Sequence, residues 1–411
     1  MDELASPARR AAVQVLFRTR RFDAWTAQTL RSVGDKMSLS EKDRALCGRL
    51  CRSVLQNAAY CDFLMAPFLR GKKIEPVLRD ILRLGVCQLF FFDKIPARAV
   101  VNESVLLAKE FLPKTAGLVN AVLRKAGEMK NNPPAIPDAG TSKELSIRYS
   151  FPEWMCERLV QRHGYSFARD YLAACNSEPP LRITENPLRT GRPIRNMEMM
   201  REGAVEDFPG FDEGVFFVQD LAPYLSVQAA DPQPGQRVLD ACAAPGGKSF
   251  AAAMRMNNLG SVYSCDINGK KLSFIDEGAA RLGLDIIETL PMDASKPYER
   301  FNNSFDLVMA DVPCSGFGVI RRRPEIRYKK EEDIARLPEI QLSILKGLSD
   351  CVRPGGVLHY STCTVWEEEN HAVIQAFLAQ DSRFSLAEER SFWPHLDGTD
   401  GFYYCKMIRH D

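Results

Sequence analysis

The chain has 411 residues, 45% of them hydrophobic, which is enough to bury the cores of two or three domains. No stretch approaches the ~20 uncharged apolar residues of a membrane span, and the N-terminus lacks the apolar core of a signal peptide. Twelve cysteines without a C-x-x-C pair argue against a disulfide framework and a zinc knuckle. We expect a cytoplasmic, monomeric protein with no metal and no membrane partner.

The net charge of +1 hides an uneven distribution of charge along the chain. Residues 1–130 contain 23 Lys and Arg against 13 Asp and Glu, whereas residues 131–411 contain 31 against 40. A basic N-terminal part followed by an acidic remainder indicates a polyanionic partner such as RNA. An ordinary solvated helical surface is the alternative explanation.

The first 130 residues have helical periodicity, as in 76-PVLRDILRLGVCQLFFF-92 and 116-AGLVNAVLRKAGEM-129. We expect an all-α bundle over 1–130. Residues 131–142, NNPPAIPDAGTS, concentrate Pro, Asn, Gly and Ser, a composition that predicts a linker.

The rest of the chain contains two further patterns. Residues 143–215 mix a helical piece with short extended runs, which predicts a small α+β domain. From 216 to 411, apolar strands alternate with helical stretches, as in 237-RVLDAC-242 and 305-FDLVMADV-312. Continuous apolar strands separated by helices predict a doubly wound α/β fold, with a parallel sheet covered on both faces.

Ligands of open α/β sheets bind beyond the carboxyl ends of the strands, so the residues at these positions are candidates for the site. The glycine turn 242-CAAPGGKS-249 follows the first strand and opens a helix, whose free N–H groups can approach a ligand closely. Asp266 ends the second strand, nineteen residues beyond Gly247, where it could accept both hydroxyl protons of a ribose. Asp293 could accept from an exocyclic amine or cap the next helix. A dinucleotide and S-adenosylmethionine both fit this arrangement.

Two cysteines favour the methyl donor. Cys314 and Cys363 each follow an apolar strand, and Asp311 lies three residues before Cys314. C5 of a pyrimidine becomes nucleophilic only after a thiolate adds to C6, so a pyrimidine C5-methyltransferase needs a reactive cysteine and a group that stabilises the ring at N3. Either cysteine alone would be expected to be a buried structural thiol, but their common placement beside Asp311 favours catalysis.

Four motifs resemble those of the Sun/NOL1/NOP2 family of RNA cytosine-C5 methyltransferases. They are 239-LDACAAPGGKS-249, 311-DVPCSGFGVIRRRPE-325, 361-STCTVWEEEN-370 and 397-DGTDGFYYCKMIR-409. The N-terminal segments 43-DRALCGRLCRSVLQN-57 and 118-LVNAVLRK-125 are similar to the helical NusB-like RNA-binding domain that precedes the catalytic part in bacterial small-subunit rRNA members. The middle region, with 181-LRITENPL-188, is similar to the family's RRM-like segment.

The resemblance implies a role for each matching position. Cys363 would be the nucleophile, Cys314 would help to release the product, and Asp311 would face the donor and the target base. Asp266 would hold the ribose and Asp293 would lie by the adenine. The residues implied to wrap the methionine end of S-adenosylmethionine are Cys242, Ala243, Ala244, Pro245, Gly246, Gly247 and Lys248.

The sequence therefore predicts a Rossmann-like methyltransferase that modifies a cytosine in 16S rRNA. The alternatives are a tRNA cytosine-C5 methyltransferase, a non-catalytic RNA-binding ribosome-assembly factor and a dehydrogenase. Arg321, Arg322 and Arg323 are expected to contact phosphates near the target. The run 367–369, three glutamates, is expected to support a helix start.

Overall fold

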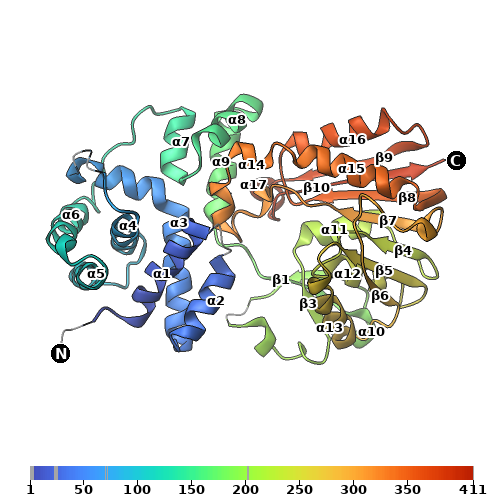
Figure 1. Cartoon of the computed structure of the whole chain (residues 1–411), viewed down its shortest axis with the longest axis horizontal. Helices are drawn as coiled ribbons and strands as arrows, with labels where there is room; N and C mark the ends of the chain where they lie inside the picture. The colour runs from blue at the N-terminus through green and yellow to red at the C-terminus, as the bar shows by residue number, and fades with distance from the viewer. Residues whose placement is uncertain (1–3, 23–25, 70, 72, 201–202, 411) are drawn as a thin grey trace. The chain divides into compact units, whose positions relative to one another are not determined.

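The computed structural model describes residues 4–22, 26–69, 71, 73–200 and 203–410, and their elements are drawn in Figure 1. They fall into two compact units. The helical unit comprises Met1–Asn176 together with Arg323–Lys329, and the sheet unit comprises Ser177–Arg322 together with Lys330–Asp411.

Nine α-helices build the described part of the helical unit. Apolar residues at three- and four-residue spacing on these helices enclose one core, as the periodicity predicts. Gly85 allows a close helix contact, because a Cβ there would lie 2.6 Å from the Leu123 side chain. The helices are α1 (Pro7–Phe22), α2 (Thr26–Lys36), α3 (Glu41–Leu69), α4 (Pro76–Phe91), α5 (Ala97–Phe111), α6 (Ala116–Glu128), α7 (Ser142–Tyr149), α8 (Glu153–His163) and α9 (Tyr165–Asn176), with the 3-10 turn η1 (Pro113–Thr115) before α6.

Helix α3 is kinked at Asn57, whose backbone angles are not helical. The N–H groups of Ala59 and Tyr60 donate to Ser150 Oγ, at 3.0 and 3.2 Å, instead of to the helix. The carbonyls four residues earlier, which would pair with them in a straight helix, belong to Leu55 and Gln56. Both carbonyls instead accept hydrogen bonds from a segment that is far away in the sequence.

That segment is the 3-10 helix η6 (Pro324–Tyr328). Tyr328 Oη donates to the Leu55 carbonyl at 2.7 Å, and Arg327 Nη1 donates to the Gln56 carbonyl at 3.3 Å. The fully buried Arg327 guanidinium also donates to the Tyr149 carbonyl at 3.1 Å and to Asn176 Oδ1 at 2.8 Å. Residues of the 323–329 segment therefore complete the hydrogen bonding of the kinked helix.

Helices α7, α8 and α9 belong to this helical unit, which differs from the separate α+β domain predicted over 143–215. The physical reason is packing: α7 contacts α3, and Leu145, Met155 and Leu159 are buried. The proline-rich 131–142 segment does separate two groups of helices, but it does not separate two compact units.

The sheet unit contains a seven-stranded sheet of order β6-β5-β4-β7-β8-β10-β9. Strands β4 to β8 are parallel, and β10 pairs antiparallel with both β8 and β9. Carboxyl ends of the parallel strands therefore meet at one edge. The strands are β4 (Arg237–Asp240), β5 (Ser261–Asp266), β6 (Ile287–Pro291), β7 (Phe305–Asp311), β8 (Val352–Thr362), β9 (Phe384–Phe392) and β10 (Phe402–Arg409).

Helices cover both faces of this sheet (Figure 1), as the doubly wound prediction requires. On β7, Val308 packs with the core of α15 and α16, whereas Leu307 packs with the core of α11, α12 and α13. Successive strand residues point to opposite faces, so a buried two-sided strand must be continuously apolar. The helices are α11 (Leu221–Ala230), α12 (Gly247–Arg255), α13 (Leu272–Leu282), α14 (Glu331–Ile334), α15 (Leu337–Ser349), α16 (His371–Leu378) and α17 (Pro394–Asp397).

A small antiparallel sheet of order β2-β1-β3 belongs to the same unit. Asn186, just after β1, donates to the Leu282 carbonyl of α13 at 2.9 Å, and Arg281 Nη1 donates to the Phe216 carbonyl at 3.1 Å. These bonds attach the small sheet to the large unit, and its likeness to an RRM fold stays a prediction. Its elements are β1 (Arg182–Glu185), α10 (Pro187–Thr190), β2 (Asn196–Glu198) and β3 (Phe216–Val218).

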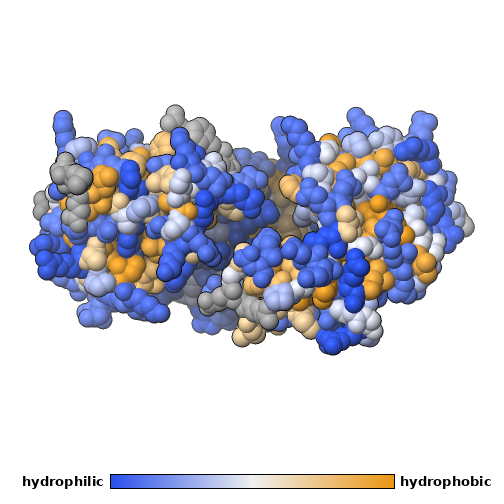
Figure 2. Space-filling view, turned by 90° about the horizontal axis from the view of Figure 1, so that it is seen from below, coloured by the Kyte–Doolittle hydropathy of each residue, from blue (hydrophilic) through white to orange (hydrophobic). Residues whose placement is uncertain are grey.

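The face drawn in Figure 2 is mostly hydrophilic, with hydrophobic residues scattered over it. Among the described residues, no helix combines the length and apolar character that a membrane crossing needs.

Candidate active site

The loop between β4 and α12 is built for close approach of a ligand. Asp240 ends the strand, and the helix begins at Gly247. Gly246 has a φ of 109°, a left-handed conformation that favours glycine, and a Cβ there would lie 2.5 Å from the Phe250 ring. The turn thus leaves bare backbone beside the N-terminus of a nine-residue helix.

Two of the predicted aspartates lie at neighbouring strand ends but bind local backbone. Asp266 accepts from the Ala244 N–H at 3.3 Å through Oδ2 and from the Asn268 N–H at 2.8 Å through Oδ1. Asp293 is exposed and accepts from both the hydroxyl and the N–H of Ser295, at 2.7 and 2.9 Å, which lowers its pKa. Asp293 therefore closes a local turn and does not cap a helix, because the next helical turn, η4 (Glu299–Phe301), begins only at Glu299.

A cavity of about 190 Å³ lies against the glycine turn. Three carboxylates and one ammonium face it, so its lining is acidic. Asp266, Asp293 and the two cysteines at 314 and 363 are not among the residues that line it. The lining consists of Val218, Gln219, Asp220, Pro223, Asp240, Cys242, Ala243, Ala244, Pro245, Gly247, Lys248 and Asp311.

Asp240 is the most unusual group in this lining. It is fully buried, and burial raises its pKa to about 6, although its Oδ2 accepts from Ser249 Oγ at 2.7 Å. Its Oδ1 has no hydrogen-bond partner among the described residues. A buried acceptor in this state suits a ligand that brings a donor or a positive charge. The lining therefore fits S-adenosylmethionine, which carries a sulfonium and an ammonium group.

Lys248 and Asp311 form an ion pair inside the site, with Nζ 2.6 Å from Oδ2. Asp311 Oδ1 accepts from Ser361 Oγ at 2.8 Å, so the carboxylate is held from two sides. Burial by itself lowers the pKa of the Lys248 ammonium, but the Asp311 charge and hydrogen bond outweigh this and raise it. Lys248 is therefore charged and fixes Asp311 next to β8.

The structure brings the two predicted cysteines together. Cys314 follows β7 and Cys363 follows β8, which are adjacent parallel strands with Asp311 opposite Ser361. Their Sγ atoms lie 3.2 Å apart, and both side chains are partly exposed. Two thiols at this distance can act on one bound group.

The loops that carry these cysteines are locked to each other. Ser315 and Thr364, the next residues along, share a hydrogen bond between their hydroxyls of 2.7 Å. Gly318 donates its N–H to the Cys363 carbonyl at 3.0 Å, and Gly401 donates to the Gly318 carbonyl at 2.8 Å. A Cβ on Gly318 would lie only 1.9 Å from the Gly401 carbonyl oxygen, so only glycine allows this contact.

Two thiols of the site, Cys314 and Cys242, have raised pKa values. A hydrogen bond with Cys363, followed by burial and by nearby negative charge, raises the pKa of Cys314 well above its usual value. Burial and the neighbouring aspartates likewise raise the pKa of Cys242. Cys242 is therefore a neutral wall of the cavity.

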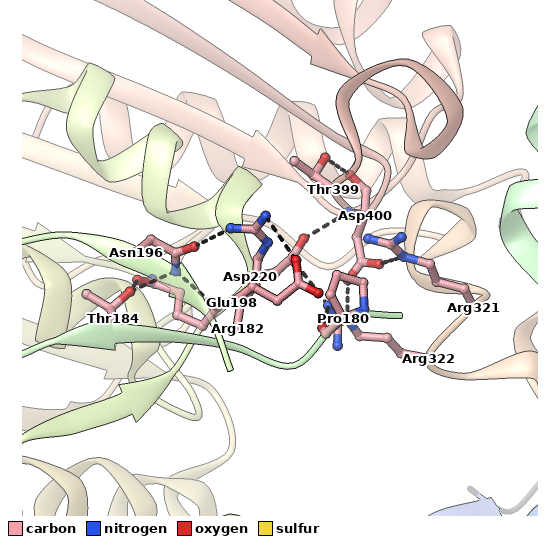
Figure 3. Close-up of polar contacts among 11 residues, drawn as sticks. Pro180, Arg182, Thr184, Asn196, Glu198, Asp220, Arg321, Arg322, Thr399 and Asp400 are labelled. Carbon is pink, nitrogen blue, oxygen red and sulfur yellow. Dashed lines mark hydrogen bonds and ion pairs between the residues drawn. The ribbon is translucent and has the colours of Figure 1, made fainter. Parts of the chain in front are cut away.

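The arginines after Cys314 are not placed as the sequence predicted. Arg321 and Arg322 both pair with the buried carboxylate of Asp400 (Figure 3), and Arg322 also donates to Asp220 Oδ1 at 2.9 Å. Asp220 in turn accepts from the Asp400 N–H at 2.8 Å. The buried Asp400 carboxylate and the partly buried Asp220 carboxylate require positive partners, so Arg321 and Arg322 neutralise these aspartates instead of meeting phosphates. Arg323 lies in the segment that belongs to the helical unit.

Sequence reasoning missed several residues at the site. Gln219 holds the glycine turn, because its Nε2 donates to the Gly247 carbonyl at 3.0 Å. Glu369 stands just before α16, as expected of the glutamate run, but its side chain is also buried against the Cys314 loop. The pair Gln219-Asp220 directly before a helix was a usable signal, whereas nothing local distinguishes Glu369 from Glu367 and Glu368. The described residues contain no group of three or more potential metal ligands.

Comparisons with known proteins agree with this fold. Residues 227–408 match the family described as 16S rRNA methyltransferase RsmB/F, and residues 6–128 match the NusB family. The crystal structure of PH0851 has a TM-score of 0.78 to this chain at 24% identity, covering 99% of this chain and 100% of that one. A methyltransferase homologue protein from Pyrococcus horikoshii has a TM-score of 0.58 at 22% identity, covering 67% of this chain and 100% of that one. These structures support the fold.

Two relatives match nearly the whole chain. The Bacillus subtilis protein named "Probable ribosomal RNA small subunit methyltransferase B" is 36% identical, covering 96% of this chain and 97% of that protein. The ribosomal RNA small subunit methyltransferase B of Yersinia enterocolitica is 32% identical, covering 93% of this chain and 95% of that protein. Identity at this level over both units shows that the chain belongs to the 16S rRNA methyltransferase RsmB/F family and carries a NusB-family domain in front of its methyltransferase domain.

Proposed function

We propose that the protein transfers a methyl group from S-adenosylmethionine to C5 of a cytosine in 16S rRNA. The observation that carries the proposal is the pair of thiols, Cys314 and Cys363, 3.2 Å apart at adjacent strand ends beside Asp311. Pyrimidine C5 chemistry needs a thiolate for C6. The relatives named as small-subunit rRNA methyltransferases support 16S rRNA over the tRNA alternative.

The donor would be held by the residues of the acidic cavity and the strand ends around it. We infer that Asp266 binds the ribose hydroxyls and that Asp293 lies by the adenine. Asp240 offers its unpaired Oδ1 to the positively charged end of the donor. The turn that would wrap the methionine end consists of Cys242, Ala243, Ala244, Pro245, Gly246, Gly247 and Lys248.

We assign the attack on the base to Cys363. Its thiolate adds to C6, and the electron pair of the C5=C6 bond moves toward C5. The Lys248–Asp311 pair, whose ammonium supplies the proton, stabilises the negative charge that develops at N3. S-adenosylmethionine, when bound, supplies the electrophilic methyl group that C5 accepts. Loss of the C5 proton to Cys314 and expulsion of the Cys363 thiolate then restore the C5=C6 double bond. The target base must leave its stack to reach both sulfurs.

The test is methyl transfer from labelled donor to unmodified 16S rRNA, together with denaturing gels of the protein. Cys363→Ala should be inactive and form no covalent RNA adduct. In Cys314→Ala, Cys363 should still attack C6 of the cytosine and C5 should still accept the methyl group, but the product should not be released. This variant should therefore accumulate a protein–RNA adduct that survives denaturation, and the double variant should not. An adduct only in Cys363→Ala would exchange the two roles, and methylation intact in both single variants would refute the covalent mechanism.

A matched control is available in Cys156→Ala. Cys156 is a buried cysteine of the helical unit, and burial raises the pKa of its thiol to about 12. This variant loses a sulfur without touching the paired thiols, so it should keep wild-type methyl transfer.

The division of labour between the parts of the chain is also a proposal. Residues 1–130 would bind RNA, residues 216–411 would carry the chemistry, and residues 131–142 would link the two groups of helices. Within 143–215, the small sheet β2-β1-β3 would be the RRM-like part. A basic charge balance over 1–130 supports the RNA-binding role through phosphate contacts. We further propose that the protein acts in the cytoplasm as a monomer.

A further inference from the structure

The peptide backbone around Cys314 is held on both sides by two buried side chains. Gln341 Nε2 donates to the Pro313 carbonyl at 3.0 Å, just before the cysteine. The Ser315 N–H, just after it, donates to Glu369 Oε2 at 2.8 Å. Gln341 Nε2 also donates to Glu369 Oε2 at 3.0 Å. We call these three hydrogen bonds, which hold the backbone on both sides of Cys314, the bracket. Glu369 is only 2% exposed and Gln341 is fully buried.

Glu369 brings a negative charge that nothing nearby cancels. Its partners in the bracket are neutral, and in the described part of the chain no Lys or Arg forms an ion pair with it. Its second oxygen, Oε1, is buried and has no hydrogen-bond partner among the residues that the structure describes. A buried carboxylate without a cation is costly, so a purely structural bracket would be served as well by a neutral glutamine. The negative charge of Glu369 therefore needs an explanation beyond the structural one.

We propose that Glu369 is a positioning residue that orients Cys314 and keeps it protonated while Cys363 attacks the base. The proposal rests on the covalent mechanism above. It adds the group that decides which of two adjacent thiols is the nucleophile. The geometry supplies the orienting part, because the Glu369 carboxylate contacts the Cys314–Ser315 peptide directly. The charge of the same carboxylate is one of the causes that raise the pKa of the Cys314 thiol.

The other groups that face Cys314 act in the same direction. Cys363, Asp311 and Glu369 all add negative charge, and burial also raises the pKa of the Cys314 thiol. Tyr360 is neutral there, because burial raises its pKa well above the usual value, and its hydroxyl donates to the Glu369 carbonyl at 2.6 Å. Lys248, the cation of the site, is paired with Asp311.

This arrangement also gives the two steps their order. The largest cause of the raised Cys314 pKa is its hydrogen bond with Cys363. Once Cys363 is a thioether, it no longer carries negative charge and is a poor acceptor. The partly exposed Cys314 thiol can then pass its proton to water, and the resulting thiolate takes the proton from C5. Glu369 remains in place through both steps, so the resulting thiolate stays a strong base.

The test is the pH dependence of alkylation by iodoacetamide, followed for each cysteine by peptide mass spectrometry in wild type and Glu369→Gln. The amide can still accept from the Ser315 N–H, so only the charge is lost. The midpoint of Cys314 alkylation should move down by about one pH unit, which makes the reaction about tenfold faster below both midpoints. Unchanged midpoints in a folded Glu369→Gln would overturn the proposal.

Two further variants separate charge from packing. Glu367→Gln, an exposed residue of the same 3-10 turn η7 (Glu367–Glu369), is the matched control and should leave the midpoint unchanged. Gln341→Leu breaks the bracket but keeps the carboxylate, so it should lower thermal stability without lowering the midpoint. A midpoint that falls as far in Gln341→Leu as in Glu369→Gln would show a packing effect and refute the role of charge.

Failure of this proposal can be told apart from failure of the proposed function, because alkylation uses neither RNA nor donor. A shifted midpoint in a protein that does not methylate RNA would support the role of Glu369 toward Cys314 and refute the methyltransferase. Should Glu369→Gln not fold, the wild-type protein still decides. Cys314 must react with a higher midpoint than Cys363, and the opposite order would overturn the proposal.

Discussion

Replacing Arg327 with Met should destabilise the helical unit strongly. The side chain is fully buried and donates to backbone carbonyls of that unit, among them those of Gln56 and Tyr149, and to Asn176 Oδ1. Its guanidinium also stacks 4.3 Å from the centre of the Phe151 ring. Met fills a similar volume but donates nothing.

The size of the effect follows from these contacts. A hydrogen bond from a charged donor contributes about 1.5–3 kcal/mol, and a buried acceptor left unpaired costs about 1–3 kcal/mol. Burying the guanidinium is itself unfavourable, which offsets part of the loss. We expect a net loss of about 3 kcal/mol in the free energy of unfolding. With an m-value of about 2 kcal/mol/M, the urea midpoint should fall by about 1.5 M.

Urea unfolding followed by far-ultraviolet circular dichroism measures this, because the unit is helical. Arg98→Met, on the exposed side of α5, is the matched control and should leave the midpoint unchanged. Arg327→Lys should recover little, because a single ammonium cannot reach carbonyls in several directions. Equal midpoints for Arg327→Met and Arg98→Met would refute the reasoning that the 323–329 segment completes the kinked helix.

Three other substitutions test the sheet unit. Gly318→Ala should separate the cysteine loops, lower the free energy of unfolding by about 1–3 kcal/mol and abolish most methyl transfer. Gly117→Ala, whose Cβ would meet nothing within 4 Å, should lower neither stability nor methyl transfer. Asp266→Ala should weaken donor binding tens-fold by calorimetry if charge-assisted bonds worth roughly 1.5–3 kcal/mol hold the ribose, and unchanged binding would contradict that assignment. Burial lowers the pKa of His359 to about 3, so as the pH falls the unfolded state binds a proton before the folded state does. The free energy of unfolding of the wild type should therefore fall as the pH drops below 6.5 toward 3, by about 2 kcal/mol at pH 5. His359→Gln should lack that part of the acid sensitivity, and an unchanged slope between pH 7 and pH 5 would refute it.

Local patterns in the sequence were sufficient for much of this architecture. Helical periodicity over residues 1–130 and continuous apolar strands from 216 onward are properties of single elements, and each element must bury its own apolar face. The strand ends also follow from the sequence, because parallel strands bring their carboxyl ends to one edge. This rule alone predicts that Cys314, Cys363 and Asp311 lie near one another, and their positions after the adjacent strands β7 and β8 confirm it.

Only the tertiary structure decided how distant segments share partners. The arginine run after Cys314 is typical of an exposed basic loop, yet Arg321 and Arg322 neutralise Asp400. Arg327 donates to a carbonyl at the kink of α3, a helix that lies far earlier in the chain. Glu369 is identical in type to its two neighbours, and only the turn of the chain buries it against Cys314. The physical reason is the same in each case: a charge or an unpaired carbonyl is costly when buried, and its partner is chosen by proximity in space, which short-range sequence patterns do not encode.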